Sequence, residues 1–187
     1  MFKHIFPILI IIVSPTLLFA SESPSEGKWP DNFQTLMANQ SFKPIGEATF
    51  TVLFWDIYKS NLLTSSGSYP IVHNKEKLVF EIQYLKDISS EDLVNRTIEQ
   101  WQHIGVASDH YQVYVPALQK LWPDIKENDS LALVFDKQNS AFYYNQEMIG
   151  VIDAPNFGQM FIDIWLAPNT SQPKLRKSLL ANLTRIK

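Results

Sequence analysis

Few side chains in this sequence have the type and spacing that catalysis or metal binding requires. The histidines are His4, His73, His103 and His110, and none lies beside a second histidine and a carboxylate at metal-ligand spacing. The absence of cysteine excludes disulfides, thiolate metal ligands and a thiol nucleophile. Neither a Gly-x-Ser-x-Gly turn nor a phosphate-binding glycine loop occurs. We therefore expect no metal, no cofactor and no catalytic residue of these classes.

Two carboxylate pairs could act as a general acid and base, but each also has a structural explanation. Glu91 and Asp92 open a predicted helix, where negative charge is favourable, and Glu127 and Asp129 lie in a predicted turn. The formal net charge is −3, and the chain has no run of basic residues. Because the phosphates of nucleic acids need a positive surface, we expect no nucleic-acid partner.

The remaining chemical feature is a high aromatic content, with five Trp, seven Tyr and twelve Phe among 187 residues. Several of these side chains, including Tyr58, Tyr84, Trp101 and Trp165, could line a groove between a sheet and helices. They could equally fill the hydrophobic core, as most large aromatic side chains do. Composition alone leaves both interpretations open.

The segments that would position these side chains alternate in hydrophobicity, as strands do. We expect two strands over about residues 43–51 and 53–63, or one long bent strand, and a clear strand over residues 78–84. A further strand is expected over residues 130–135. Asn145 and Gln146 then join a predicted hairpin of residues 141–144 and 148–152.

Four helical segments have recognisable N-termini. Ser89 and Asp109 are the expected caps of the first two, Asp153, Ala154 and Pro155 open the third, and the last begins near residues 171–173. Pro116 is expected to kink the second of these helices or to start a new one. The order of strands, helices, strands and helices predicts an α+β fold with a mainly antiparallel sheet and helices packed on one face.

The N-terminal segment has the layout of a secretion signal. Lys3 and His4 precede an apolar stretch, Ile5–Val13, and the small residue Ala20 stands at the expected cleavage site. We expect a signal peptide over residues 1–20, a flexible lead-in over 21–40 and one domain over 41–187. The protein would then be periplasmic or secreted, and an uncleaved N-terminal anchor is the alternative. No later stretch is long and apolar enough to span a bilayer.

Short segments spread from about Gly46 to Leu183 match the pattern of a known family. These segments are Tyr84-Leu85-Lys86-Asp87-Ile88, Glu99-Gln100-Trp101, Leu121-Trp122-Pro123-Asp124-Ile125-Lys126, Phe142-Tyr143-Tyr144-Asn145, Ile149-Gly150, Phe157-Gly158, Ile164-Trp165-Leu166 and Pro168-Asn169-Thr170-Ser171. In this order they resemble the exported bacterial chalcone isomerase-like proteins. The resemblance implies the chalcone isomerase fold, an open-faced β-sandwich with a long, mainly antiparallel sheet and helices on one face.

The resemblance also indicates what a catalytic member would need. The plant enzymes close a chalcone to a flavanone with an early-strand arginine, a threonine on the next strand, a tyrosine and an asparagine near the first major helix, and a late Thr or Ser. Here the first arginine is Arg96, inside a predicted helix, and Leu53 falls near the threonine position. No tyrosine lies between Tyr84 and Tyr111, while Asn95 lies near the asparagine position. Without an early arginine, a phenolate or a fatty-acid carboxylate lacks its usual partner.

We therefore expect an exported, non-catalytic domain that binds an apolar or amphipathic small molecule, lipid-like or fatty-acid-like, between the sheet and the helices. The expected lining residues are Tyr58, Tyr84, Lys86 and Trp101, with Lys86 as the candidate partner for an anion. Two alternatives remain. One is an intramolecular lyase with a different residue set, and the other is a protein-interaction module of the cell envelope whose partner the sequence does not identify.

Overall fold

The computed structural model describes residues 29–184. The predicted signal peptide, residues 1–20, and the first part of the expected lead-in, residues 21–28, lie outside the described residues. Within the described range, no helix combines the length and the apolar character that a bilayer span requires.

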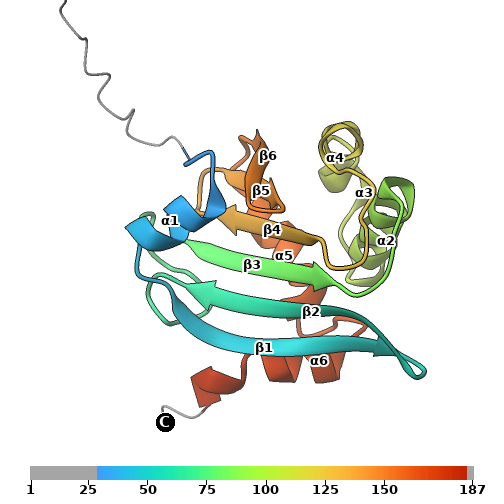
Figure 1. The fold of residues 1–187 in the computed structure, drawn as a ribbon, viewed down its shortest axis with the longest axis horizontal. Helices are drawn as coiled ribbons and strands as arrows, with labels where there is room; N and C mark the ends of the chain where they lie inside the picture. Colours follow the sequence, from blue (N-terminus) through green and yellow to red (C-terminus); the bar gives the residue numbers. More distant parts are fainter. Residues whose placement is uncertain (1–28, 185–187) are drawn as a thin grey trace, which may run out of the picture.

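Six strands form one sheet in the order β1-β2-β3-β4-β5-β6, and every neighbouring pair is antiparallel (Figure 1). The strands are β1 (Lys43–Val52), β2 (Trp55–Thr64), β3 (Leu78–Tyr84), β4 (Ser130–Phe135), β5 (Ser140–Tyr144) and β6 (Glu147–Ile152). Strands that follow one another in the chain therefore lie side by side, even though helices separate β3 from β4. The predicted α+β fold with an antiparallel sheet is confirmed.

Strands β1 and β2 form a long hairpin, which we call the arm, and its tip extends past the ends of the other strands (Figure 1). The sequence left open one bent strand or two strands, and the structure has two strands of ten residues each. Val52 pairs with Trp55, so Leu53 and Phe54 alone make the turn. Leu53 has a φ of 57°, a left-handed conformation that two-residue hairpin turns commonly require.

The helices occupy the predicted parts of the chain, with local differences at their ends. They are α2 (Ser90–His103), α3 (Ser108–Tyr111), α4 (Val115–Leu121), α5 (Phe157–Leu166), α6 (Pro173–Leu179) and the 3-10 helix η1 (Ala181–Thr184). Ser89 caps α2 by accepting a hydrogen bond from the backbone N–H of Asp92 at 3.1 Å. Pro116 lies in the first turn of α4, where its missing N–H removes no helical bond. The expected cap at Asp109 is wrong, because α3 begins at Ser108 and its N-cap is Ala107, two positions earlier. The expected helix opening at Asp153 is also wrong, because α5 begins at Phe157.

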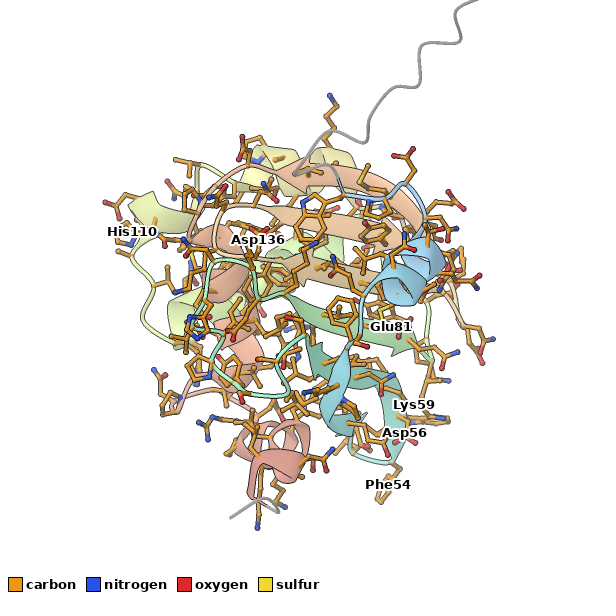
Figure 2. The ribbon with its side chains drawn as sticks, turned by 90° about the vertical axis from the view of Figure 1, so that its left-hand side faces the viewer. Phe54, Asp56, Lys59, Glu81, His110 and Asp136 are labelled. Atoms are coloured by element: carbon orange, nitrogen blue, oxygen red, sulfur yellow. The ribbon has the colours of Figure 1, made fainter. Side chains whose placement is uncertain are left out.

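The two faces of the sheet are covered differently. Helices α2, α4, α5 and α6 pack on one face around a large apolar core, with side chains such as Phe80 and Phe142 from the sheet and Phe161 from α5. The other face carries α1 (Phe33–Asn39), which packs over a smaller cluster that includes Val79 and Tyr143 (Figures 1 and 2). That cluster spans only part of the sheet. The rest of this face, over β1 and β2, carries exposed polar side chains, which makes the sandwich open on this side.

Residues 29–40, expected within a flexible lead-in, are instead packed against the sheet. Trp29 is only 5% exposed and Leu36 only 1%. Asn32 starts α1 by accepting hydrogen bonds from the backbone N–H groups of Gln34 and Thr35. A helix of seven residues gains most of its stability from such packing, so the ordered domain includes residues before the predicted boundary at 41.

Candidate functional site

The helix-facing side of the arm carries a row of aromatic rings. Phe50, Tyr58 and Tyr84 are direct register partners across β1, β2 and β3. The ring centroids of Phe50 and Tyr58 are 5.1 Å apart, and those of Tyr58 and Tyr84 are 6.1 Å apart. Because register partners project to the same face, the rings form one continuous surface. Tyr84 is buried, whereas Phe50 and Tyr58 are partly exposed.

Trp165 of α5 packs against this row from the helical layer. Its indole Nε1 donates a hydrogen bond to the Tyr58 hydroxyl oxygen at 2.8 Å. Its ring lies 4.7 Å from that of Phe80 on β3 and 5.5 Å from that of Phe161. The hydrogen bond joins residues 107 positions apart and ties the arm to α5. The space between arm and helix is therefore occupied by side chains at this point.

Lys86 and Trp55 mark the exposed end of the row. Lys86 lies in the bend that directly follows β3, two residues after Tyr84. Its Nζ lies 5.0 Å from the centroid of the Trp55 ring, which is within the range of a cation–π contact. Both side chains are exposed. We call the set Phe50, Trp55, Tyr58, Tyr84 and Lys86 the aromatic surface of the arm.

Burial keeps the two tyrosine hydroxyls of this surface uncharged. It raises the pKa of Tyr58 to about 12, and the hydrogen bond from Trp165 opposes this only in part. Burial raises the pKa of Tyr84 still further, and the neighbouring Tyr58 acts in the same direction. At neutral pH both groups are therefore phenols that can form hydrogen bonds. The positive charge of the aromatic surface comes from Lys86.

Trp101, the fourth predicted lining residue, lies elsewhere. It is completely buried in the helical layer, where its Nε1 donates to the backbone oxygen of Met160 at 3.1 Å. Its ring stacks on Tyr111 at 5.4 Å and meets Phe157 edge to face at 6.4 Å. The structure thus brings Tyr58, Tyr84 and Lys86 together and places Trp101 in the hydrophobic core.

The residues considered above for the catalytic positions of chalcone isomerases do not lie together on the arm. Arg96 points outward from α2, 77% exposed, and pairs with Glu99 at 2.8 Å. Arg176 lies on α6, where its Nε donates to a backbone oxygen at 2.8 Å. Leu53 lies in the hairpin turn and Asn95 on the exposed side of α2. Within residues 29–184, neither arginine lies on a strand.

A groove of about 540 Å³ lies away from the aromatic surface, where β1, β2 and β3 meet α1, α6 and η1. Its polar lining includes Glu47, Asn61 and Glu81. Glu81 is on the α1 side of β3 (Figure 2), and burial raises the pKa of its carboxyl, while a hydrogen bond with Asn61 lowers it. Sequence reasoning missed Glu81, although a lone carboxylate inside the apolar strand Leu78–Tyr84 was a usable signal.

A second polar cluster joins α5 to the loop between β2 and β3. Gln159 donates to the hydroxyl of Tyr69 at 3.0 Å and to the carboxylate of Asp163 at 2.7 Å. Burial raises the pKa of Asp163, against the opposing effect of its hydrogen bonds with Gln159 and Tyr69. The spacing of Gln159 and Asp163, four residues apart on one helix, could have indicated a polar stripe on α5. These groups bond to one another and lie on the loop side of α5.

The aromatic surface has the composition of a binding site for an amphipathic molecule. Rings offer apolar contact, phenol groups offer hydrogen bonds, and one ammonium group offers a partner for an anion. Residues 29–184 contain no group of three or more His, Asp or Glu side chains arranged to hold a metal ion.

Comparison with known proteins agrees with this architecture. Residues 27–181 match the family described as chalcone isomerase-like. An uncharacterized protein of Haemophilus influenzae is 27% identical over 139 residues, which are 74% of this chain and 68% of that protein. The crystal structure of a fatty-acid binding protein from Arabidopsis thaliana superposes with a TM-score of 0.58 at 11% identity, over 82% of this chain and 91% of that one. At 11% identity, the structural match shows a shared fold alone. The family match extends over most of the sequence. The chain therefore belongs to the chalcone isomerase-like family.

Proposed function

We propose that this protein is an exported, non-catalytic member of its family that binds an apolar or amphipathic small molecule, lipid-like or fatty-acid-like, where the arm meets the helices. The observation that carries the proposal is the aromatic surface with a single lysine at its exposed end. Phe50, Tyr58 and Tyr84 would contact the apolar part of the ligand. Lys86 would pair with a carboxylate or another anionic end. The likeness to a fatty-acid binding protein of the same fold supports the same ligand class.

The packing at Trp165 restricts how such a ligand can lie. Tyr58, Trp165 and Phe80 are in direct ring contact or hydrogen-bonded, so an acyl chain would first lie along the partly exposed rings of Phe50 and Tyr58. Deeper entry would require the indole of Trp165 to separate from the Tyr58 hydroxyl. Binding is then expected to change the tryptophan emission, because the environment of Trp165 changes.

The charges near the arm favour binding over catalysis. A ring closure of the chalcone isomerase type develops negative charge on substrate oxygens and needs fixed donors or cations in a water-poor site. Lys86 is exposed, so water and salt screen its charge. Tyr58 and Tyr84 are neutral, and both described arginines lie on helices. These features suit retention of a ligand better than stabilisation of a transition state.

The proposal is tested by isolating the protein from its own cells, analysing it by native mass spectrometry, and titrating it with oleate. We expect a bound lipid or fatty acid, and a Lys86→Gln variant that binds oleate about two- to fivefold more weakly, as for an exposed ion pair. Binding of oleyl alcohol should change little in this variant. Lys120→Gln, at an exposed position on α4, is the matched control. A protein that is consistently empty and binds neither fatty acids nor flavonoids contradicts the proposal.

A further inference from the structure

The tip of the arm exposes four consecutive apolar residues, Val52-Leu53-Phe54-Trp55. Their exposed fractions are 46%, 85%, 95% and 63%, respectively. Figure 2 shows Phe54 at the far end of the arm, directed away from the body of the molecule. The other large apolar side chains with high exposure in residues 29–184 are single residues such as Val72 and Val113. The tip is therefore a contiguous apolar patch, which calls for an explanation that scattered residues do not need.

The backbone geometry of the turn does not explain why Leu53 and Phe54 occupy it. Leu53 has a φ of 57°, a conformation that strongly favours glycine or asparagine, and a two-residue turn would normally have one of these there. Phe54 makes up the rest of the loop and has almost no contact with the protein, since 95% of its surface is exposed. Leu53 therefore strains the turn, and both side chains gain little packing within residues 29–184. Packing within the domain does not account for apolar residues at these two positions.

We propose that the tip inserts into the surface of a lipid bilayer that contains anionic headgroups. Leu53 and Phe54 would enter the acyl boundary, at the depth of roughly 5–10 Å that interfacial segments reach. Trp55, one residue further from the end, would lie at the interface, where indole rings are favoured. The Lys86 Nζ, 5.0 Å from that ring, would then lie among the headgroups.

The charges behind the tip are compatible with an anionic surface. Lys59 lies on the same arm (Figure 2), on the face of β2 opposite Tyr58, and adds a second positive charge. Asp56 is the opposing charge, and its carboxylate accepts a hydrogen bond from the Thr51 hydroxyl at 2.6 Å. Asp87, next to Lys86 in the chain, is paired with Lys126 at 3.1 Å, so Lys86 and Lys59 against Asp56 leave a net attraction for anionic lipid. Insertion of apolar side chains remains the main contribution, because exposed charges are screened by salt.

The size of the patch favours a bilayer over a protein partner. Four side chains of this kind offer on the order of 500 Å², whereas a stable complex buries about 800 Å² on each partner. A narrow two-residue loop would also need a matching pocket on a protein, while a bilayer adapts to any apolar shape. The inference does not depend on ligand binding at the aromatic surface.

The experiment measures co-sedimentation of the purified protein with vesicles of phosphatidylcholine containing about one third phosphatidylglycerol, a composition chosen for its anionic surface. The decisive variant is Leu53→Gly with Phe54→Ser, because it places glycine at the positive φ and should fold at least as well as the native chain. We expect its partitioning to fall at least about tenfold. Val113→Ser, which removes an apolar side chain that is 68% exposed elsewhere, should leave partitioning unchanged.

Trp55 provides a local readout that other apolar segments of the chain cannot imitate. Trp29, Trp101 and Trp122 are 5% exposed or less, and Trp165 is only partly exposed, whereas Trp55 is 63% exposed. Brominated lipids should therefore quench mainly Trp55, and Trp55→Phe should abolish most of the quenching while Trp165→Phe should not. Equal vesicle binding by the Gly-Ser variant, or no quenching of Trp55, overturns the proposal. Self-association that disappears in the Gly-Ser variant, without vesicle binding, would overturn it in favour of a second copy as the partner.

Discussion

Replacing Tyr58 by phenylalanine should destabilise the protein by about 1–2 kcal/mol, because the indole N–H of Trp165 loses its acceptor. The bond is 2.8 Å long, and both side chains are partly buried. Leaving a buried donor unsatisfied costs about 1–3 kcal/mol, and partial access to water places this case in the lower half of that range. The ring contacts of Tyr58 with Phe50 and Tyr84 remain in the variant, so the change isolates the hydroxyl.

A double-mutant cycle with Trp165→Phe separates the hydrogen bond from the loss of the indole ring. We expect Trp165→Phe to cost more than Tyr58→Phe, since it also loses contact with Phe80 at 4.7 Å. The double variant should be less destabilised than the sum of the single variants by about 1 kcal/mol, the contribution of the shared bond. Urea unfolding followed by circular dichroism measures these free energies, and about 2–4 °C in Tm per kcal/mol provides an independent check.

Tyr114→Phe is the control for removing a tyrosine hydroxyl. The Tyr114 ring packs against Phe157, and its hydroxyl forms no hydrogen bond with a side chain of residues 29–184. It should change the free energy of unfolding by less than about 0.5 kcal/mol. Strict additivity of Tyr58→Phe and Trp165→Phe would refute the argument. The arm and α5 would then not be coupled through this bond, and Tyr58 could not report ligand entry between them.

Three further predictions concern Gly46, Glu81 and catalysis. Gly46→Ala should destabilise the protein by about 3 kcal/mol, because its Cβ would overlap the backbone oxygen of Ser178 and push α6 off β1. A Tm close to that of the native protein would contradict this. Burial raises the pKa of Glu81 above its ordinary value of 4.5, so the folded protein holds a proton that the unfolded chain releases. The stability that this group contributes should therefore fall as pH rises from about 4.5 through the raised pKa, and Glu81→Gln should reduce that fall in urea titrations while the exposed control Glu127→Gln leaves it unchanged. A hydroxychalcone incubated with the protein should lose its enone absorbance at the rate seen in buffer, and a faster, saturable decay would show that a catalytic residue set exists after all.

Local patterns predicted the elements of this fold well. The alternation of apolar residues over 78–84 became β3, the turn residues Asn145 and Gln146 joined β5 to β6, and Ser89 capped α2. Each of these features depends on side chains within a few positions of one another, so a short window of sequence contains the whole interaction. Asp109 and Asp153 were the exceptions, because several nearby residues could have started α3 and α5.

The site was only partly predictable. Tyr58 and Tyr84 lie side by side, as their places on alternating strands indicated, and their role in ligand binding stays a prediction. Trp101 has the same residue type and a helical position, yet it turned out to be a core residue, since burial depends on which helix face meets α5. The contact between Lys86 and Trp55 was not foreseeable, as it depends on the register of β2 against β3.

The sequence by itself determined the elements, the α+β class, the family resemblance and the lack of an early arginine. Only the tertiary structure decided that Trp165 bonds to Tyr58 across 107 residues, that α1 covers the far face of the sheet, and that Leu53 and Phe54 are left exposed at the end of the arm. The physical reason is that burial is a property of the assembled chain. Whether an apolar side chain becomes core or surface depends on what the sheet register and the helix packing bring next to it.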